Sequence, residues 1–328
     1  MKAITIKNKK LYWEEVPNPQ IKADEVLIKI SAAAINRADI MQTDGEYPPP
    51  PGAPAWPGLE ISGEIVEISE KAKQKSRWKN GDKVCALLSG GGYAEYVAVP
   101  YYMVMPIPEN ISMIEASALP EAFATGYLKL IVEGKAKKGD TVLVQAGASG
   151  IASVIIPMAK ALGFRVLTTV LNETIAQSIS HLNADVVIDT SKENLASVLK
   201  KEAENGKPVN VVVDCLGGKD VTECLPYVSY GCRWIIIATL AGDIAEINLR
   251  TLFMKNIRLI GSTLRSKTPE VKAEILSNLV KDVWPLVAKG DVRPKIFKVY
   301  PITEVTDAHQ LLRDGKSIGK VVLTISNE

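Results

Sequence analysis

Residues 144–152 read Val144-Gln145-Ala146-Gly147-Ala148-Ser149-Gly150-Ile151-Ala152. An apolar stretch over residues 141–145 predicts a strand leading into this turn, and an amphipathic pattern over residues 151–162 predicts a helix leading out. Small side chains let the backbone approach a pyrophosphate, and the helix N-terminus supplies N–H groups and the positive end of a dipole. The turn therefore predicts a dinucleotide-binding βα unit. Because it is not a clean G-x-G-x-x-G, a tight turn without a ligand remains the alternative.

Strands and helices alternate on the C-terminal side of this turn. The predicted strands are apolar and rich in β-branched residues, and segments of helical length separate them; they cover residues 141–145, 165–170, 185–189, 209–214, 233–239 and 258–262. This pattern is typical of a parallel, doubly wound sheet. A predicted helix over residues 121–133 precedes it.

The N-terminal part of the chain follows a different pattern. Short predicted strands over residues 26–30, 61–68 and 94–99 are separated by turn signals, which favours a barrel-like antiparallel domain. After residue 265 come two helical stretches and a strand over 320–325, which we expect to return to this first domain. The predicted class is α/β, with residues 1–118 and 266–328 in one β-rich domain and residues 119–265 in a Rossmann domain.

Composition argues against several kinds of binding partner and against several cellular locations. The 39 basic and 37 acidic residues give a net charge of +2, too small to predict a nucleic-acid or membrane surface. The four cysteines form no C-x-x-C pair, so neither a disulfide framework nor a structural zinc site is expected. The first residues contain no apolar signal core, and no apolar run is long enough to span a bilayer, so we expect a cytoplasmic protein.

Motifs spread over essentially the whole chain resemble the zinc-independent, quinone oxidoreductase-like branch of the medium-chain dehydrogenase/reductase superfamily. The motifs are AINRAD at 34–39, GEYPPP at 45–50, PGLEISG at 57–63, CALLSGGGYAE at 85–95, LPEA at 119–122, DCLGG at 214–218 and IGK at 318–320. The resemblance implies that the β-rich part is a GroES-like catalytic domain, with hydride transfer in the cleft between the two domains.

The same resemblance implies a site without metal. Zinc-dependent relatives have a histidine where this chain has Leu59, and the cysteine ligand expected near residues 36–39 is absent. His181 and His309 are the two histidines, both in helix-like stretches far from these motifs, and we interpret them as solvated or structural.

The resemblance also implies which residues form the catalytic site. Asn36, Asp39 and Tyr47 would face the nicotinamide end of the site. Tyr47 would donate a hydrogen bond to the substrate oxygen, unless water delivers the proton or the ring merely packs on the proline run at 48–51. Placing the cofactor carbon and stabilising the developing oxyanion are what such a reaction requires of the protein.

A second set of residues is implied in cofactor binding. Glu121 either holds the cleft or is a first-turn carboxylate favoured by the helix dipole. Thr125 would lie near the nicotinamide, and Gly319 and Lys320 would close over the cofactor phosphates, unless Lys320 is simply a strand-edge lysine. The remaining positions of this set are Ala146, Ser149, Gly150, Ile151, Asn172, Gly217 and Ala238.

Several of these positions depart from the family pattern. Relatives that bind NADPH have a glycine-serine pair followed by lysine after the second Rossmann strand, where this chain has bulky Leu171, Asn172 and acidic Glu173. Glu173 would repel a 2′-phosphate and favour NADH. Ala152 and Ala238 stand where relatives have glycine, which suggests a narrowed groove.

Two functions follow from these observations. The first is reduction of quinones or α,β-unsaturated carbonyl compounds with NADPH, or alternatively NADH. The second is redox-neutral chemistry on a specialised metabolite, such as cyclisation, isomerisation or condensation, with weakened cofactor binding or none. Either takes a small-molecule substrate. Because relatives are commonly homodimers joined through the last Rossmann strand, residues 258–262 are the expected edge for a second copy.

Overall fold

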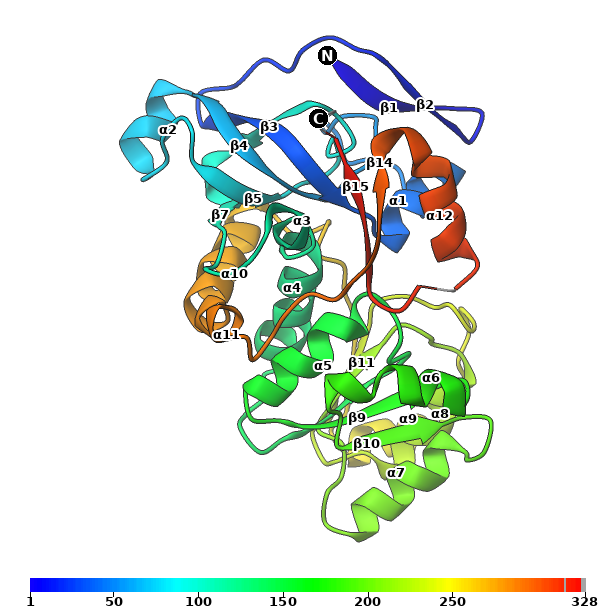
Figure 1. Cartoon of the computed structure of the whole chain (residues 1–328). Coiled ribbons are helices and arrows are strands. Elements are labelled where there is room, and N and C mark those ends of the chain that lie inside the picture. Colours follow the sequence, from blue (N-terminus) through cyan, green and yellow to red (C-terminus); the bar gives the residue numbers. More distant parts are fainter. Residues whose placement is uncertain (316, 326–328) are drawn as a thin grey trace. The chain divides into compact units, whose positions relative to one another are not determined.

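The computed structural model describes residues 1–315 and 317–325. The chain divides into two compact units (Figure 1). Unit 1 comprises Met1–Ala124, Thr268–Lys289 and Pro294–Glu328, and unit 2 comprises Thr125–Lys267 and Gly290–Arg293. These junctions lie close to the expected ones at 118/119 and 265/266, except that the short segment Gly290–Arg293 packs with unit 2.

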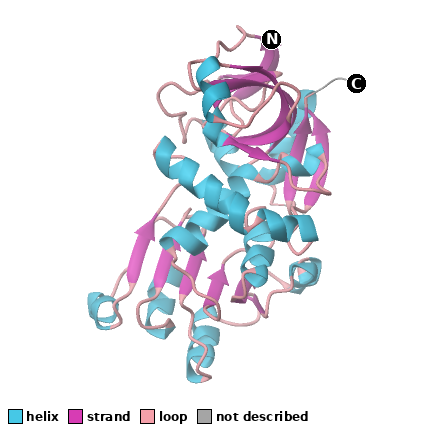
Figure 2. Cartoon of the chain, turned by 90° about the vertical axis from the view of Figure 1, so that its left-hand side faces the viewer, coloured by secondary structure: helices cyan, strands magenta, loops and turns pink. Residues whose placement is uncertain are grey.

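Unit 2 contains a six-stranded sheet in the order β10-β9-β8-β11-β12-β13, and every neighbouring pair is parallel. The strands, drawn side by side in Figure 2, are β8 (Thr141–Val144), β9 (Arg165–Val170), β10 (Val186–Asp189), β11 (Val211–Asp214), β12 (Arg233–Ile236) and β13 (Arg258–Gly261). The strand order reverses between β8 and β11, and β13 is an edge. The predicted doubly wound sheet is therefore confirmed.

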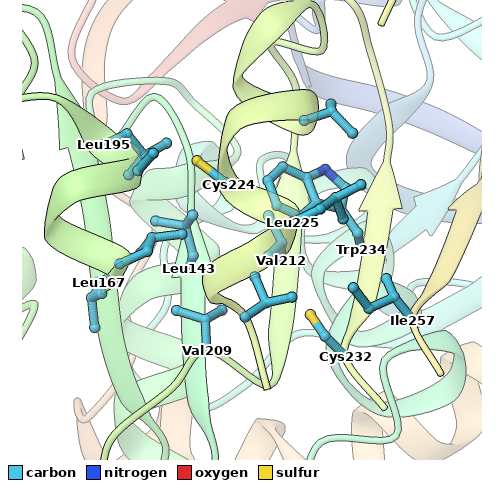
Figure 3. Close-up of a cluster of buried hydrophobic side chains, with 14 of the residues drawn as sticks. Leu143, Leu167, Leu195, Val209, Val212, Cys224, Leu225, Cys232, Trp234 and Ile257 are labelled. Atoms are coloured by element: carbon cyan, nitrogen blue, oxygen red, sulfur yellow. The ribbon is translucent and has the colours of Figure 1, made fainter. Parts of the chain in front are cut away.

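Helices follow the strands of this sheet. They are α5 (Ala152–Ala161), α6 (Glu173–Ser178), α7 (Leu195–Glu204), α8 (Lys219–Cys224) and α9 (Leu249–Met254). A buried cluster fills the space between the helices and the sheet (Figure 3), with Leu143, Leu167 and Trp234 from the strands meeting Leu225. The Trp234 indole N–H keeps a partner in this apolar setting, because it donates to Asp214 Oδ2 at 2.7 Å.

Unit 1 is built on a seven-stranded sheet in which β14-β15-β3-β4-β5-β7 are neighbours and β6 also pairs with β3. Its strands are β3 (Glu25–Ala34), β4 (Glu60–Ile68), β5 (Lys83–Leu87), β6 (Tyr96–Pro100), β7 (Val104–Pro106), β14 (Ile296–Pro301) and β15 (Lys320–Thr324); β1 (Lys2–Lys7) and β2 (Lys10–Glu15) form a separate hairpin. All pairs in the large sheet are antiparallel except β14 with β15. Because β15 has a neighbour on each side, the alternative of Lys320 as a strand-edge lysine is wrong.

The helices of unit 1 lie at strand connections. They are α1 (Arg37–Asp44), α2 (Glu70–Lys75), α3 (Met113–Ala116), α10 (Pro269–Asp282), α11 (Trp284–Lys289) and α12 (Val305–Arg313). Short 3₁₀ turns cover Tyr101–Met103 and Ile302–Glu304 in unit 1 and Ser180–Leu182 and Leu225–Tyr227 in unit 2. No helix in the described residues is long and apolar enough to cross a membrane.

The predicted helix over residues 121–133 is two kinds of helix in succession. α4 (Pro120–Tyr127) continues as a π-helical segment, Leu128–Glu133. The wider winding is visible at its end, where the Gly134 N–H donates to Lys129 O, five residues back, at 2.9 Å. The prediction was right about extent, and a sequence pattern based on 3.6-residue periodicity does not distinguish the wider turn.

Candidate active-site and cofactor-binding residues

The start of α1 is fixed by a reciprocal cap between Asn36 and Asp39. Asn36 is the N-cap, and its backbone N–H donates to Asp39 Oδ2 at 2.8 Å. The other carboxylate oxygen, Oδ1, accepts the Gly58 N–H at 2.9 Å, so Asp39 joins α1 to the PGLE motif. Asp39 is fully buried, and burial raises the pKa of its carboxyl group to about 6. In this geometry Asp39 is a positioning residue; its predicted catalytic role stays a prediction.

Glu60 and Lys320 form a buried ion pair beside this cap. Lys320 Nζ lies 2.7 Å from Glu60 Oε1, and the two side chains are 3% and 0% exposed. Lys320 also donates to Asn36 Oδ1 at 2.7 Å and to Ile35 O at 3.2 Å. An ammonium group has three donors, so all three are used inside unit 1. Lys320 would therefore have to give up a partner to hold a cofactor phosphate.

Glu60 connects three elements of unit 1. Its Oε1 accepts from Lys320 on β15 and from Asn36 Nδ2 at 3.0 Å, while its Oε2 accepts the Glu121 backbone N–H at 2.8 Å. The last contact satisfies an N–H in the first turn of α4, where a helix has no partner of its own. Glu60 was missed as a site residue from sequence, although it lies directly after Leu59 in a motif already singled out.

The other predicted residues of unit 1 have the following environments. Tyr47 is half-buried just beyond α1, and its backbone N–H reaches Met41 O at 3.3 Å. Gly319 has φ +111, and a Cβ there would lie 2.5 Å from Lys295 O, so only glycine fits this turn into β15. The roles of Tyr47 toward the substrate and of Gly319 toward the cofactor stay predictions.

His309 lies in the core of unit 1 rather than in solvent. Its Nε2 is 3.4 Å from the Tyr93 hydroxyl, and both side chains are buried. Desolvation lowers the pKa of His309 to about 4, so the ring is neutral at physiological pH. Of the two interpretations made from the sequence, solvated or structural, this packing agrees with a structural role for His309.

In unit 2 the glycine-rich turn is held against the end of β9. The Ala146 and Gly147 N–H groups donate to Thr169 Oγ1 and Thr169 O at 2.9 and 2.8 Å. Ala146 has φ +53, a left-handed conformation. Ser149 Oγ accepts from the Ala152 N–H at 3.2 Å, at the start of α5. The turn thus brings its backbone and the N-terminus of a ten-residue helix to the carboxyl end of β8.

Residues after β11 and β12 reach the same edge of the sheet. Asp214 Oδ1 accepts the Leu216 and Gly217 N–H groups at 2.8 and 2.9 Å and so folds the DCLGG motif back over the strand end. Gly217 also forms a parallel bridge with Gly242, and Ala238 follows β12, half-buried. In open α/β sheets, ligands bind where the strand order reverses, and here that point lies between β8 and β11.

The end of β9 carries a charge arrangement that the sequence did not predict. Asn172 caps α6 by accepting the Ile175 N–H at 3.0 Å. Glu173 forms an ion pair with Lys192, which also lies 3.9 Å from Asp189. Although no lysine follows Glu173 in the chain, one reaches it from the segment after β10. Because neighbouring parallel strands end at the same edge of a sheet, the sequence could have indicated that Lys192, after β10, lies near Glu173, after β9.

The described residues offer no set of side chains that fits a zinc site. Within residues 1–315 and 317–325, no group of three or more His, Cys, Asp or Glu side chains is placed to hold a metal ion. Leu59 offers no donor atom, and the four thiols, Cys85, Cys215, Cys224 and Cys232, are all buried. Desolvation raises the pKa of each thiol, which disfavours the thiolate that binds metal.

Comparison with known proteins agrees with both units. Residues 22–109 match the family described as alcohol dehydrogenase GroES-like domain, and residues 182–323 match the zinc-binding dehydrogenase family. A quinone oxidoreductase-like protein 2 homolog of Nematostella vectensis is 30% identical over 303 residues, which cover 91% of this chain and 81% of that protein.

Solved structures give the same result. A Mycobacterium abscessus protein described as a "probable oxidoreductase" is 29% identical, with a TM-score of 0.83 and coverage of 99% of each chain. A mycobacterial protein solved in complex with NADPH is 24% identical, with a TM-score of 0.85 over 99% of this chain and 100% of that one, which shows the shared fold. Together with the motifs and the two sheets, these likenesses show that the chain belongs to the quinone oxidoreductase-like branch of the medium-chain dehydrogenase/reductase superfamily, a family of oxidoreductases.

Proposed function

We propose that this protein is a cytoplasmic, zinc-independent reductase that uses NADPH, or alternatively NADH, to reduce quinones or α,β-unsaturated carbonyl compounds. The observation that carries the proposal is the edge of unit 2 at the strand reversal. There the turn after β8, the N-terminus of α5 and the folded-back Gly217 segment lie at the carboxyl ends of the neighbouring strands β8 and β11. A helix N-terminus with small residues around it suits a pyrophosphate. The NADPH complex of the mycobacterial neighbour supports the same choice of ligand.

When bound, the nicotinamide supplies the hydride, and the protein has to orient it and the substrate. On the unit 1 side, the cap of Asp39 and the Glu60–Lys320 pair hold Asn36 at a fixed place and thereby fix the start of α1. Tyr47, just beyond the end of α1, supplies a hydroxyl for the substrate oxygen. The roles proposed are thus orientation for Asn36 and hydrogen-bond donation for Tyr47.

The charges at the end of β9 bear on the choice between NADPH and NADH. Glu173 and Asp189 contribute two negative charges and Lys192 one positive charge, so the group keeps a net charge of −1. That charge disfavours a 2′-phosphate, although Lys192 offers an ammonium to pair with one. Glu173→Gln would remove the repulsion and leave Lys192 available. We expect this variant to gain affinity for NADPH relative to NADH.

Cofactor binding is tested by thermal stabilisation of the full chain. A ligand that binds the folded state at 100 times its Kd stabilises it by about 2.7 kcal/mol. We expect NADPH or NADH to raise the melting temperature. Glu173→Gln should increase the rise with NADPH relative to the rise with NADH. No shift in melting temperature with either cofactor at millimolar concentration would refute the proposal and favour the redox-neutral alternative. The residues that support that alternative are Ala152, Leu171, Glu173 and Ala238. The side chain of Leu171 is 73% exposed.

Substrate reduction is tested by nicotinamide oxidation with a quinone and an enone. Tyr47→Phe should lower turnover while the affinity for cofactor stays unchanged. Equal turnover would remove Tyr47 from the mechanism. Activity should persist after dialysis against a chelator, and its loss would contradict zinc independence.

A homodimer joined through β13 is the proposed assembly. β13 is an edge strand, and α9, which immediately precedes it in the chain, has no buried residue although it contains Leu249, Phe253 and Met254. Phe253 is 64% exposed, and exposed apolar side chains and an open strand edge are both typical of an interface. Light scattering should give twice the 35.5 kDa chain mass, and Phe253→Lys should give the monomer. Leu171→Lys is the matched exposed control.

A further inference from the structure

A basic pocket opens on unit 2 where the strands of its sheet begin. It has a volume of about 340 Å³, and its lining includes Lys135, Lys137, Arg233, Asn256 and Arg258. Arg233 and Arg258 are the first residues of β12 and β13. The predicted cofactor residues lie at the other end of these parallel strands, so this pocket is separate from the proposed function.

Arg233 forms a fixed, half-buried base for the pocket. Its guanidinium donates to the carbonyl oxygens of Gly134, Gly231 and Lys135 and to Asp140 Oδ2, the last at 3.2 Å. These bonds use four of the five guanidinium donors, which leaves one Nη1 hydrogen without an acceptor among the described residues. The carboxylate of Asp140 is already paired with Arg233, and it also accepts the Lys137 N–H at 3.1 Å. Asp140 is therefore neutralised by a partner that three backbone carbonyl oxygens also hold.

The rim carries cations without counter-charges. Lys135, Lys137 and Arg258 are exposed, and none of the three has an ion pair within the part of the chain that the structure describes. With Arg233 and Asp140 included, the pocket has a charge of +3, more than the +2 of the whole chain. Cations gathered around a concave surface raise the local potential and the local concentration of anions.

We propose that this pocket binds the dianionic phosphate group of a small molecule, either inorganic phosphate or a phosphate monoester. Arg233 Nη1 has one hydrogen left to donate, and Lys135 and Lys137 line the same pocket. Hydrogen bonds from charged donors to phosphate are about twice as strong as neutral ones. A ligand here also relieves the repulsion among the three rim cations.

The test is calorimetric titration of the full chain with inorganic phosphate and with methyl phosphate, at constant ionic strength maintained with sodium chloride. The variant is Lys135→Gln/Lys137→Gln, which leaves Arg233 and its structural contacts intact. The matched control is Lys200→Gln/Lys207→Gln, which removes two exposed lysines elsewhere on unit 2. A repeat with saturating NADH, which unlike NADPH carries no phosphate monoester, separates this pocket from the cofactor site.

We expect binding that weakens about five- to tenfold in the pocket variant, the amount for two solvent-screened charge contacts. Binding by the control should equal that of the wild type, and NADH should not compete. Equal weakening in both variants would overturn the proposal, and so would the absence of any heat of binding up to about 10 mM ligand, roughly tenfold above a Kd of about 1 mM. So would binding that appears only in the monomeric Phe253→Lys background, because a second copy would then cover the pocket.

Discussion

Replacing Lys320 by methionine tests whether the buried ion pair organises unit 1. Methionine keeps the length of the side chain and its apolar stem but removes the ammonium that contacts Glu60, Asn36 and Ile35. Glu60 would remain fully buried with an uncompensated charge. Removing one member of a buried pair costs about 3–5 kcal/mol of unfolding free energy, because the remaining charge has lost both water and its partner.

A double-mutant cycle separates the pair from the packing of each side chain. Glu60→Gln keeps an acceptor for the Glu121 N–H but removes the charge, so it leaves Lys320 buried and unpaired. The double variant has neither charge. We expect its cost to fall short of the sum of the two single costs by ~1–3 kcal/mol.

Urea unfolding followed by tryptophan fluorescence suits this measurement. Trp13, Trp56, Trp78 and Trp284 belong to unit 1, and Trp234 is the fifth tryptophan of the chain. The control is Lys73→Met, which removes a pair with Glu70 whose side chains are 52% and 81% exposed, and it should cost no more than ~0.5 kcal/mol.

Two results would refute the reasoning. One is a Lys320→Met variant within ~1 kcal/mol of the wild type, which is the range of an exposed pair. The other is full additivity of the two single substitutions, which would mean that the charges do not interact. Either would return Lys320 to the role implied by resemblance, a ligand of the cofactor phosphates.

Three further predictions concern unit 1. Burial raises the pKa of Asp39 from 3.8 to about 6, so the wild type should lose about 3 kcal/mol of unfolding free energy as pH rises from about 4 to 6. Asp39→Asn should lack this loss. Parallel curves of melting temperature against pH for the two proteins would contradict the prediction. The pKa of His309 is lowered from 6.5 to about 4, so the stability that the neutral ring contributes is present above pH 6.5 and is lost as pH falls toward 4. In His309→Gln the melting temperature should therefore fall less steeply on the acid side of its pH curve. An unchanged slope there would count against the prediction. Gly319→Ala places a Cβ 2.5 Å from Lys295 O and should lower the melting temperature more than Gly290→Ala, which has a similar positive φ but no atom within 4 Å of the added Cβ; equal losses would mean that φ alone matters.

The sequence predicted the sheet of unit 2 well because its signals are local. Parallel strands buried on both faces are runs of apolar residues, and β9 spans the predicted residues 165–170. The cap of α1 was also within reach, since asparagine followed three residues later by aspartate is a local spacing. The turn at residues 144–152 and the family motifs likewise predicted where a cofactor site would lie.

What could not be predicted depends on pairs far apart in the chain. Lys320 and Glu60 are separated by 260 positions, and nothing near either residue indicates that the other will neutralise it. Glu173 looked like a lone repulsive charge because Lys192 reaches it only once β9 and β10 lie side by side. The electrostatic partners of these residues thus depended on the tertiary fold.

The burial of all four thiols has a consequence for the chemistry proposed. Quinones and enones are Michael acceptors, and a cysteine thiolate adds to them irreversibly on the timescale of turnover. Burial raises the pKa of Cys85, Cys215, Cys224 and Cys232, so the nucleophilic form is scarce at each, and none is exposed to reagent. A protein that processes such electrophiles would thereby resist alkylation by its own substrates.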